Sequence, residues 1–507
     1  MMSTSNTLGF AHFDDYPRAR EVLLRANYTP EGMGETLGST GALTAQSADA
    51  PVWLRRTSGN EPLHTLIRLF LLNVAVEPDK AHHALAPMAL ESWLEAGLLA
   101  MENDQVVPRI QLQSYHGLIL ASDMPKAIHT GTRPDHVMGV AKSSMLLLNN
   151  TLRRPARRVL DVGTGCGIQA LLCCAHSKQV FATDRNPRAE LFTHFNAALN
   201  GLTNLQGLTG NLFEPVSGQR FDLIVCNAPY VISPHARFMF CDSGMRGDEF
   251  CRLIIQQAAQ FLEDGGYAQL VCNWTHGASQ DWQEGLAHWF DGTGCDVLVL
   301  GGSTESASNY ASNWIRDTDP NSSEQHFTAA YNEWMDYYAR EGIETISHGV
   351  ITMRRTDGMI NWIRLDDAPP QMTGPTGEAI IRSFQAQDFL ENTKDDQQLL
   401  QERFRYSPHV RFEQLLEPTA DGWSAAASRL RLLQGLAYVN DVNAHVANLV
   451  VRCTGEHPLQ VLLLELASAI GADAQQFVPQ AVPVVRHLIR QGFLLPSSIA
   501  LPESTTT

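Results

Sequence analysis

Short apolar runs alternate with amphipathic stretches through the middle of the chain, from residue 131 to about residue 356. Seven runs have the length and composition of strands that are buried on both faces of a sheet. They are RVLDV at 158–162, VFATD at 180–184, LQGLTG at 205–210, FDLIVCN at 221–227, YAQLVCNW at 267–274, CDVLVLGG at 295–302 and HGVITMRR at 348–355. Helical periodicity fills the intervals, and AAYNEWMDYYARE predicts a further helix before the last strand. This alternation predicts an α/β fold with a doubly wound, mostly parallel sheet of seven strands.

The stretch before this region has a different pattern. Helical periodicity at Leu63–Ala75 and at Pro87–Leu98 is followed by QVVPRIQLQSYHGLILASD, whose alternation is typical of a β-ribbon. Two helices and a ribbon predict a winged-helix-like module. Residues 458–496 repeat this plan, and Gly97 and Gly492 each follow a helical stretch, where a left-handed cap favours glycine.

We therefore expect three domains, at residues 1–130, 131–356 and 357–507, in which the two flanks are winged-helix-like α+β domains. Winged helices often bind nucleic acid, but neither flank carries the basic, polar helix face that such docking needs. The pattern favours a role in packing or in partner recognition.

Composition narrows the class of protein further. The longest apolar stretches, such as Met145–Leu148 and Val461–Leu464, are far shorter than the roughly 20 residues that span a bilayer. The first residues do not have the pattern of a signal peptide, so we expect a cytoplasmic protein with no membrane partner. The net charge of −17 disfavours polyanionic partners. Eight of the nine cysteines lie between Cys166 and Cys295 without the spacing of a zinc site or a disulfide framework, so they are interpreted as core residues and no metal is expected.

A glycine-rich turn follows the first predicted strand in VLDVGTGCGIQALL. Gly163, Gly165 and Gly167 let the backbone pass close to a ligand, and the helix that follows directs its N–H groups to the same crevice. An NAD-binding loop would need glycine at position 168, where this chain has isoleucine. Asp161 also lies inside the end of the preceding strand. The spacing favours a nucleoside cofactor other than NAD.

Four motifs in fixed order, DVGTGCG, ATDRNPRA, GNLFEP and NAPY, resemble the class I S-adenosylmethionine-dependent methyltransferases. Within that class the region 131–355 is similar to the release-factor glutamine N5-methyltransferases and the methyltransferase small domain. The resemblance implies S-adenosylmethionine as cofactor on a Rossmann-like sheet. The residues expected to hold it are Asp161, Gly163, Thr164, Gly165, Cys166, Gly167, Asp184, Asn211, Leu212 and Asn227.

Two of these residues have particular roles. Asp184 ends the second strand, where a carboxylate can accept hydrogen bonds from both hydroxyls of a ribose. The alternative for Asp184 is a helix N-cap ahead of Asn186-Pro187. By resemblance Asn211 and Leu212 contact the adenine edge, although the family commonly has aspartate where this chain has Asn211.

The strand FDLIVCN ends abruptly at Asn227-Ala228-Pro229-Tyr230, the expected catalytic residues. An amide or base amino nitrogen is a poor nucleophile because its lone pair is delocalised. The side-chain oxygen of Asn227 and the main-chain carbonyl of Ala228 could accept its two hydrogens and direct its lone pair at the methyl group. Tyr230 could pack flat against the planar group. The family usually has Asn-Pro-Pro-Tyr, so Ala228 replaces a rigid proline.

These features predict an enzyme that transfers a methyl group from S-adenosylmethionine to a planar amide or amino nitrogen. The favoured acceptor is a glutamine side chain of a protein partner. Two alternatives stay open at this point: a methyltransferase that acts on RNA or DNA bases, and a protein that holds the cofactor without turnover.

Overall fold

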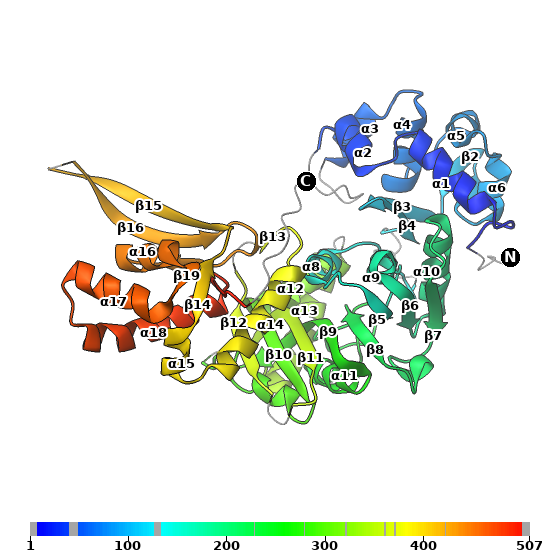
Figure 1. Ribbon diagram of the computed structural model, residues 1–507. Coiled ribbons are helices and arrows are strands. Elements are labelled where there is room, and N and C mark those ends of the chain that lie inside the picture. The colour runs from blue at the N-terminus through cyan, green and yellow to red at the C-terminus, as the bar shows by residue number, and fades with distance from the viewer. Residues whose placement is uncertain are drawn as a thin grey trace. The chain divides into compact units, whose positions relative to one another are not determined.

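The computed structural model describes residues 8–39, 49–125, 133–227, 229–277, 279–319, 322–358, 361–369, 372–420 and 422–498. The chain divides into two compact units (Figure 1). The first comprises Met1–Leu148 and Arg154–Asp366, and the second comprises Asn149–Arg153 and Asp367–Thr507. Within the described residues, no helix combines the length and the apolar character that crossing a bilayer requires.

An eight-stranded sheet forms the centre of the first unit. Its strands are β5 (Ala156–Val162), β6 (Ser177–Asp184), β7 (Leu205–Thr209), β8 (Phe221–Cys226), β9 (Leu262–His276), β10 (Cys295–Ser306), β11 (Thr345–Arg355) and β12 (Ile363–Asp367). They run in the order β12-β10-β11-β9-β8-β5-β6-β7. The pairings among β5 to β9 are parallel, and β11 is antiparallel to both β9 and β10.

All seven predicted strands are present, but the predicted total of seven is wrong because β12 adds an eighth at the edge beyond β10. This strand is short and only partly buried, so it lacks the apolar run that identified the others. Since β5 lies between β6 and β8, the chain reverses its direction of travel across the sheet after β7. The carboxyl ends of β5 and β8 therefore border the crevice in which open α/β sheets bind ligands.

Helices precede β5 and lie between several of the strands, as the periodicity predicted, but the described residues between β7 and β8 and between β9 and β10 form only 3-10 turns. The helices are α8 (Lys142–Asn150), α9 (Ile168–Cys173), α10 (Pro187–Leu199), α11 (Glu249–Gln260), α12 (Ala307–Thr318) and α13 (Glu324–Glu341), and the 3-10 turns are η2 (Cys174–His176), η3 (Glu214–Val216) and η4 (Leu286–Phe290). The segment AAYNEWMDYYARE lies in α13, as expected. Ser323 caps this helix by accepting from the N–H of His326, and Gly342 ends it with a φ of 67°.

The N-terminal part of this unit is mostly helical. Its elements are α1 (Asp15–Arg25), α2 (Pro30–Leu37), α3 (Ala50–Arg56), α4 (Pro62–Leu66), the π-helical turn η1 (Ile67–Leu71), α5 (Pro78–Leu85), α6 (Leu90–Glu95), β1 (Leu99–Glu102), β2 (Gln105–Pro108), β3 (Ile110–Tyr115) and β4 (Leu118–Asp123). The predicted ribbon is present as β2, which pairs with β1, and as the hairpin of β3 and β4. Gly97 follows α6 with a φ of 77°, in the left-handed conformation that its position predicted.

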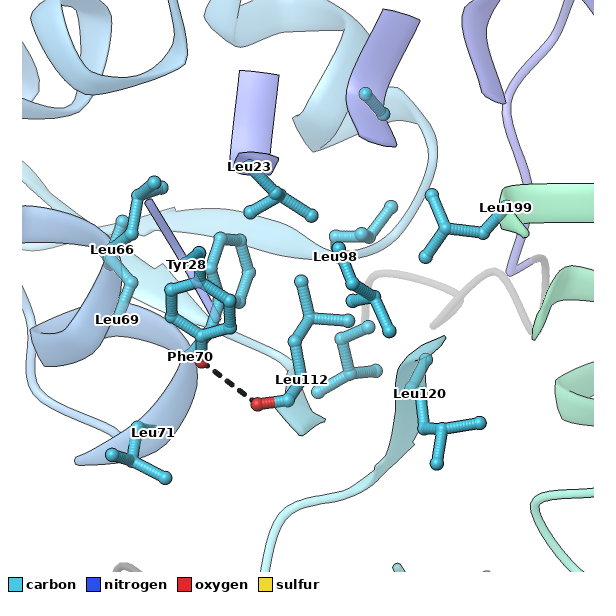
Figure 2. Close-up of a cluster of buried hydrophobic side chains, with 14 of the residues drawn as sticks. Leu23, Tyr28, Leu66, Leu69, Phe70, Leu71, Leu98, Leu112, Leu120 and Leu199 are labelled. Atoms are coloured by element: carbon cyan, nitrogen blue, oxygen red, sulfur yellow. Dashed lines mark hydrogen bonds between the residues drawn. The ribbon is translucent and has the colours of Figure 1, made fainter. Parts of the chain in front are cut away.

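One hydrophobic core joins this N-terminal part to the sheet domain. Figure 2 shows leucines of the N-terminal helices and of β3 and β4 packed around Tyr28, whose hydroxyl donates to the carbonyl of Leu112 at 2.9 Å. Leu199 of α10 belongs to the same cluster. Burying each such leucine contributes roughly 1.5–3 kcal/mol, so the N-terminal helices and α10 stabilise one another.

The second unit combines helices with strands of very different lengths. Its elements are β13 (Met372–Thr373), α14 (Gly377–Asn392), α15 (Asp396–Gln401), β14 (Arg403–Tyr406), β15 (Val410–Thr419), β16 (Gly422–Leu432), β17 (Gly435–Leu436), β18 (Val439–Asp441), α16 (Ala444–Arg452), β19 (Thr454–Pro458), α17 (Leu459–Ile470), α18 (Ala474–Arg490) and β20 (Leu494–Pro496). Strands β15 and β16 form a long hairpin whose other neighbour is β18. Gly492 follows α18 with a φ of 82°, as its position predicted.

The domain limits and the winged-helix-like character of the flanks stay predictions. The predicted boundary near residue 130 lies outside the described residues. All nine cysteine side chains are buried, as expected of core residues, and the described residues contain no disulfide.

Candidate functional site

The turn between β5 and α9 is held together from inside by Asp161. Its carboxylate accepts from the hydroxyl of Thr164 at 2.7 Å and from the N–H of Ala170 at 3.1 Å. Burial raises the pKa of Asp161 to about 7, although both hydrogen bonds act in the opposite direction. The N–H groups of Gly163 and Thr164 donate to the carbonyl of Thr183 on the neighbouring strand. The buried carboxylate of Asp161 therefore fixes the conformation of the turn through these hydrogen bonds.

The three glycines of this turn have left-handed φ values of 72°, 55° and 87°. A Cβ added to Gly165 would meet no atom within 4 Å, so this position faces open space. A Cβ on Gly167 would lie 2.7 Å from Cδ1 of Leu171 and 3.0 Å from the hydroxyl oxygen of Thr193. Gly165 thus leaves room for a ligand, whereas Gly167 lets α9 pack closely.

Cys166 contributes its backbone to this turn. Its side chain lies in the hydrophobic core, and burial raises the pKa of the thiol to about 11. Its carbonyl accepts from the side-chain amide of Asn196 on α10 at 2.8 Å. The thiol is therefore not positioned as a nucleophile.

Asp184 lies where β6 ends and contacts the glycine-rich turn. One carboxylate oxygen accepts from the N–H of Gly165 at 3.0 Å, and the other accepts from the N–H of Asn186 at 2.9 Å. Burial raises the pKa of Asp184 above its ordinary value. The alternative role of Asp184 as N-cap is wrong, because Asn186 caps α10 by accepting from the N–H of Arg188.

Asn211 and Leu212 follow β7, next to the end of β6. The N–H of Gly210 donates to the carbonyl of Asp184 at 2.9 Å, which brings the two strand ends together. Leu212 adopts a φ of 48°, an uncommon conformation for a non-glycine residue. Its side chain packs on the core beneath the sheet, while Asn211 is exposed.

Asn227 is the first residue beyond β8. Its side-chain N–H₂ group lies 3.3 Å from the hydroxyl oxygens of both Ser143 and Ser144 on α8, to which it donates. Its side-chain oxygen is buried and has no hydrogen-bond partner among the described residues. An orphaned buried acceptor costs about 1–3 kcal/mol, so this oxygen marks a place where a donor is required.

The rest of the NAPY motif is only partly described. Ala228 lies outside the described residues, and Pro229 follows it directly. Tyr230 packs against the core beside Asn227's strand, and burial raises the pKa of its phenol to about 12. Its hydroxyl also interacts with Ser143. Ser143 of α8 therefore contacts both ends of the motif.

Sequence reasoning missed Ser143 and Ser144. The amide of Gln169, on α9, donates to the carbonyl of Ser144 at 3.0 Å, so α8 is fixed to the helix that follows the glycine-rich turn. The only available signal was the pair of serines ahead of the apolar run in KSSMLLL, which is typical of a helix start.

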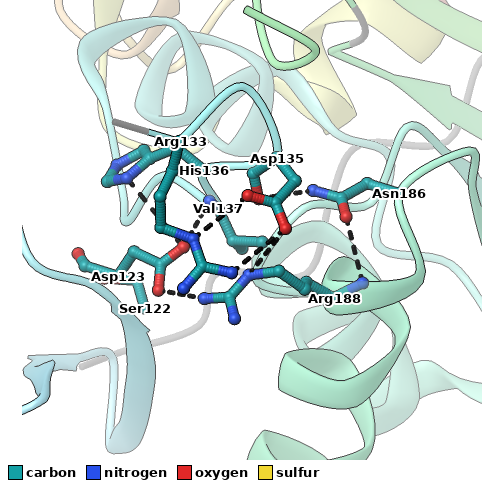
Figure 3. Close-up of polar contacts among 8 residues, drawn as sticks. All are labelled: Ser122, Asp123, Arg133, Asp135, His136, Val137, Asn186 and Arg188. Carbon is teal, nitrogen blue, oxygen red and sulfur yellow. Dashed lines mark hydrogen bonds and ion pairs between the residues drawn. The ribbon is translucent and has the colours of Figure 1, made fainter. Parts of the chain in front are cut away.

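A second group that was missed supports the start of α10. Figure 3 shows the guanidinium groups of Arg133 and Arg188 directed at the carboxylate of Asp135, with Arg188 also paired to Asp123 at the end of β4. The hydrogen bond from Arg133 holds the pKa of Asp135 below its ordinary value. Burial lowers the pKa of His136 to about 4, so this imidazole is neutral near pH 7.

Hydrogen bonds of this network connect the chain at residues 135–137 to the end of β4 and to the start of α10. The side chain of Asn186 donates to the carbonyl of Asp135 at 2.9 Å, and the N–H of Val137 donates to Asp123 at 2.8 Å. The chain leading into α8 is therefore tied to the residues that follow Asp184. The same network therefore supports α8, which contacts Asn227, and the residues that follow Asp184.

Comparison with known families adds an independent observation. The methyltransferase small domain matches residues 138–292. Two domains of unknown function, DUF7059 and DUF7782, match residues 25–109 and 382–496.

Known proteins resemble part of the chain. A release factor glutamine methyltransferase of Xylella fastidiosa is 38% identical over 135 residues, which are 24% of this chain and 49% of that protein. A "Putative protein N5-glutamine methyltransferase" of Methanocaldococcus jannaschii is 32% identical over 139 residues, 26% of this chain and 69% of that protein. A crystal structure of ribosomal protein L11 methylase from Lactobacillus delbrueckii subsp. bulgaricus is 28% identical, covers 25% of this chain and 57% of that one, and has a TM-score of 0.20.

The chain spans about half the length of the Xylella relative and more than two thirds of the Methanocaldococcus relative. The match to the methyltransferase small domain, at residues 138–292, covers the strands and turns that build the crevice. The chain belongs to the class I S-adenosylmethionine-dependent methyltransferases, in the family of the methyltransferase small domain and the glutamine N5-methyltransferases.

Proposed function

We propose that this chain methylates the side-chain amide nitrogen of a glutamine in a protein partner. The observation that carries the proposal is the buried, unpartnered side-chain oxygen of Asn227 at the carboxyl end of β8. A primary amide has two N–H hydrogens to donate, and its nitrogen becomes a better nucleophile when acceptors hold both.

The residues around the glycine-rich turn fit S-adenosylmethionine. Open space above Gly165 would admit the ligand, and the backbone of Gly163, Thr164, Cys166 and Gly167 would border it, over Asp161. The carboxylate of Asp184 would accept from the ribose hydroxyls, and Asn211 with Leu212 would border the adenine. When bound, the cofactor supplies an electrophilic methyl group on a sulfonium sulfur.

The acceptor side would work by orientation. Asn227 accepts one amide hydrogen through its side-chain oxygen, and the carbonyl of Ala228 accepts the other. Because the side-chain nitrogen of Asn227 donates to the hydroxyls of Ser143 and Ser144, its oxygen is the atom left for the acceptor. Tyr230 packs against the planar amide. The acceptor nitrogen would form a bond to the methyl carbon as the carbon–sulfur bond breaks, the electron pair of that bond would stay on sulfur, and the nitrogen would lose one proton to solvent.

Labelled methyl transfer tests this proposal. The purified chain, S-adenosylmethionine with a radiolabelled methyl group and a cell lysate are incubated at two salt concentrations, and portions are then treated with protease or with ribonuclease. We expect protease-sensitive label that is recovered as N5-methylglutamine. Label that ribonuclease releases, and that falls as salt rises, would instead identify a nucleic-acid substrate.

A third result distinguishes enzyme from binding protein. Calorimetry that shows cofactor binding without label in either fraction would mean that the domain holds the cofactor without turnover. The Asn227→Ala variant is the matched control for each fraction, since label that persists in it does not arise at this site.

A further inference from the structure

The chain beyond Tyr230 forms a loop, residues 231–242, that closes on itself. The N–H of Val231 donates to the carbonyl of Cys241 at 3.1 Å. The carboxylate of Asp242 accepts from the hydroxyl of Ser233 at 2.7 Å and from the N–H groups of Arg237 and Phe238 at 3.0 Å. This loop is continuous with the NAPY motif, so its placement determines where the motif lies.

Two helices that are inserted between β10 and β11 cover this loop. The cluster includes Val231, Ile232, Phe238 and Cys241 of the loop, together with side chains of α12 and α13. The helix residues in it are Ala307, Tyr310, Ala311, Ile315, Trp334, Tyr337 and Tyr338. Neither helix takes part in the sheet, and their buried side chains pack on the loop.

Both backbone polar groups of Ile232 are bound by tyrosines of these helices. The hydroxyl of Tyr338 donates to the carbonyl of Ile232 at 2.8 Å, and the N–H of Ile232 donates to the hydroxyl oxygen of Tyr310 at 3.4 Å. Ile232 is 1% exposed, so water does not satisfy these groups. We call this arrangement the tyrosine clamp, made by Tyr310 and Tyr338 on Ile232.

The clamp is also fixed to the sheet. The side-chain amide of Asn273, on β9, donates to the hydroxyl oxygen of Tyr310 at 2.7 Å. Burial raises the pKa of both phenols well above the ordinary value, so both hydroxyls keep their hydrogens at any working pH. The loop is thereby held between two helices and a central strand.

Ile232 is two residues beyond Tyr230 and five beyond Asn227. Each residue spans at most about 3.6 Å, so a shift at Ile232 reaches the motif through very little intervening chain. From the other direction, the contacts of Ser143 and Ser144 with the described residues of the motif are to side chains, those of Asn227 and Tyr230. The backbone of the motif therefore depends on an anchor further along the chain.

We propose that Tyr310 and Tyr338 are positioning residues for methyl transfer, because they fix Ile232 and so hold the Asn227–Tyr230 segment in the geometry that the acceptor nitrogen needs. This inference rests on the proposed function. It assigns α12 and α13 a role in catalysis without contact to either substrate.

Hydrogen exchange tests the clamp without an acceptor. Tyr338→Phe and Tyr310→Phe keep the rings and remove the hydroxyls, and Tyr331→Phe is the matched control. Tyr331 lies on α13, and its hydroxyl makes no hydrogen bond to another described residue. We expect the amides of residues 229–242 to exchange about tenfold faster in the first two variants, with residues 156–184 unchanged. Unchanged exchange at 229–242 in both variants overturns the clamp.

Kinetics then test the positioning role on the protein fraction that the parent chain labels. We expect kcat to fall about tenfold in Tyr338→Phe, the KM for S-adenosylmethionine to stay within about twofold, and Tyr331→Phe to match the parent. Adding Tyr338→Phe to Asn227→Ala should cost little more, because the clamp acts through Asn227. Fully additive losses, or a parental kcat despite faster exchange, overturn the positioning role.

The two failures are distinguishable. A parent chain that binds S-adenosylmethionine but labels no acceptor overturns the proposed function, and with it the catalytic meaning of the clamp, whereas the exchange result still shows whether the clamp holds the loop.

Discussion

The two sides of the crevice differ in how their polar groups are satisfied. On the cofactor side, the carboxylates of Asp161 and Asp184 accept hydrogen bonds from the chain itself. On the acceptor side, the side-chain oxygen of Asn227 is buried without a partner among the described residues. The two carboxylates are thus satisfied in advance, whereas Asn227 retains an acceptor that a further molecule can satisfy.

The largest expected effect is on the acceptor side. Asn227→Ala should lower the turnover of methyl transfer by roughly 100-fold or more, the scale for removing one group aimed at the reacting atoms. Cofactor affinity should change much less. Single-turnover kinetics and calorimetry measure the two quantities in parallel.

Ser143→Ala is the matched control for that variant. It removes one of the two hydroxyls that bind the Asn227 side chain but leaves the unpartnered oxygen in place. We expect a loss of fivefold or so in turnover, on the order of one neutral hydrogen bond. Equal losses in the two variants would mean that orientation, and not the acceptor oxygen, is the main contribution of Asn227.

The next effect belongs to the cofactor side. Asp184→Ala should weaken S-adenosylmethionine binding by about 1.5–3 kcal/mol, the range for hydrogen bonds to a charged group. Asp184→Asn keeps one acceptor oxygen and should fall between the variant and the parent. Calorimetry of all three proteins checks this order, and equal affinity in Asp184→Ala and parent would remove Asp184 from the cofactor site.

Two glycines of the same turn have different roles: Gly165 faces open space, and Gly167 lies in close packing. Gly167→Ala should lower the free energy of unfolding by about 2 kcal/mol or more, because a left-handed φ and a close contact with Leu171 both oppose a Cβ. Gly165→Ala should cost only about 1 kcal/mol of stability. Its methyl group enters open space, so it should reduce cofactor affinity instead. Chemical denaturation and calorimetry on both variants test this contrast.

The last expected effect is a dependence of stability on pH. The folded pKa of Asp161, about 7, is above its unfolded value of 3.8, so between these values the folded state binds more protons than the unfolded state. This contribution is present at low pH and is lost as the pH rises from about 4 to about 7. Asp161→Asn keeps an acceptor for Thr164 and Ala170 and does not titrate.

Relative to Asp161→Asn, the parent should therefore lose stability on the order of 1 kcal/mol per pH unit across that window. Denaturation of the two proteins at pH 4.5, 5.5 and 6.5 measures the difference. Parallel curves would indicate that the Asp161 carboxyl titrates alike in the folded and unfolded states.

The same comparison explains what the sequence could predict. Asp161 accepts hydrogen bonds from residues three and nine positions away, and Gly165 donates to Asp184 nineteen positions away. Because the contacts on the cofactor side join residues that are near one another in the sequence, its motifs can be recognised from the sequence. The roles of the individual site residues stay predictions, but their grouping around one turn was foreseen. On the acceptor side, Asn227 was identified by the strand end that it follows.

The residues that hold the acceptor side in place could not be predicted from the sequence. Tyr310 and Tyr338 are 78 and 106 residues away from Ile232, and no periodicity connects a helix in an insertion with a loop before it. Arg188 and Asp123, at 65 residues, were missed for the same reason. Strand β12 was missed because an edge strand needs no continuous apolar run.

The segment that carries α12 and α13 lies between two strands that pair with each other, β10 and β11. Antiparallel neighbours such as β10 and β11 can be joined by a turn of two residues, so the pairing of these strands does not require residues 307–344. Under the proposed function, substitutions in these helices would alter the loop that follows the NAPY motif and leave the hydrogen bonds of the glycine-rich turn in place. The rate of methyl transfer would then change without a change in how the methyl donor is held.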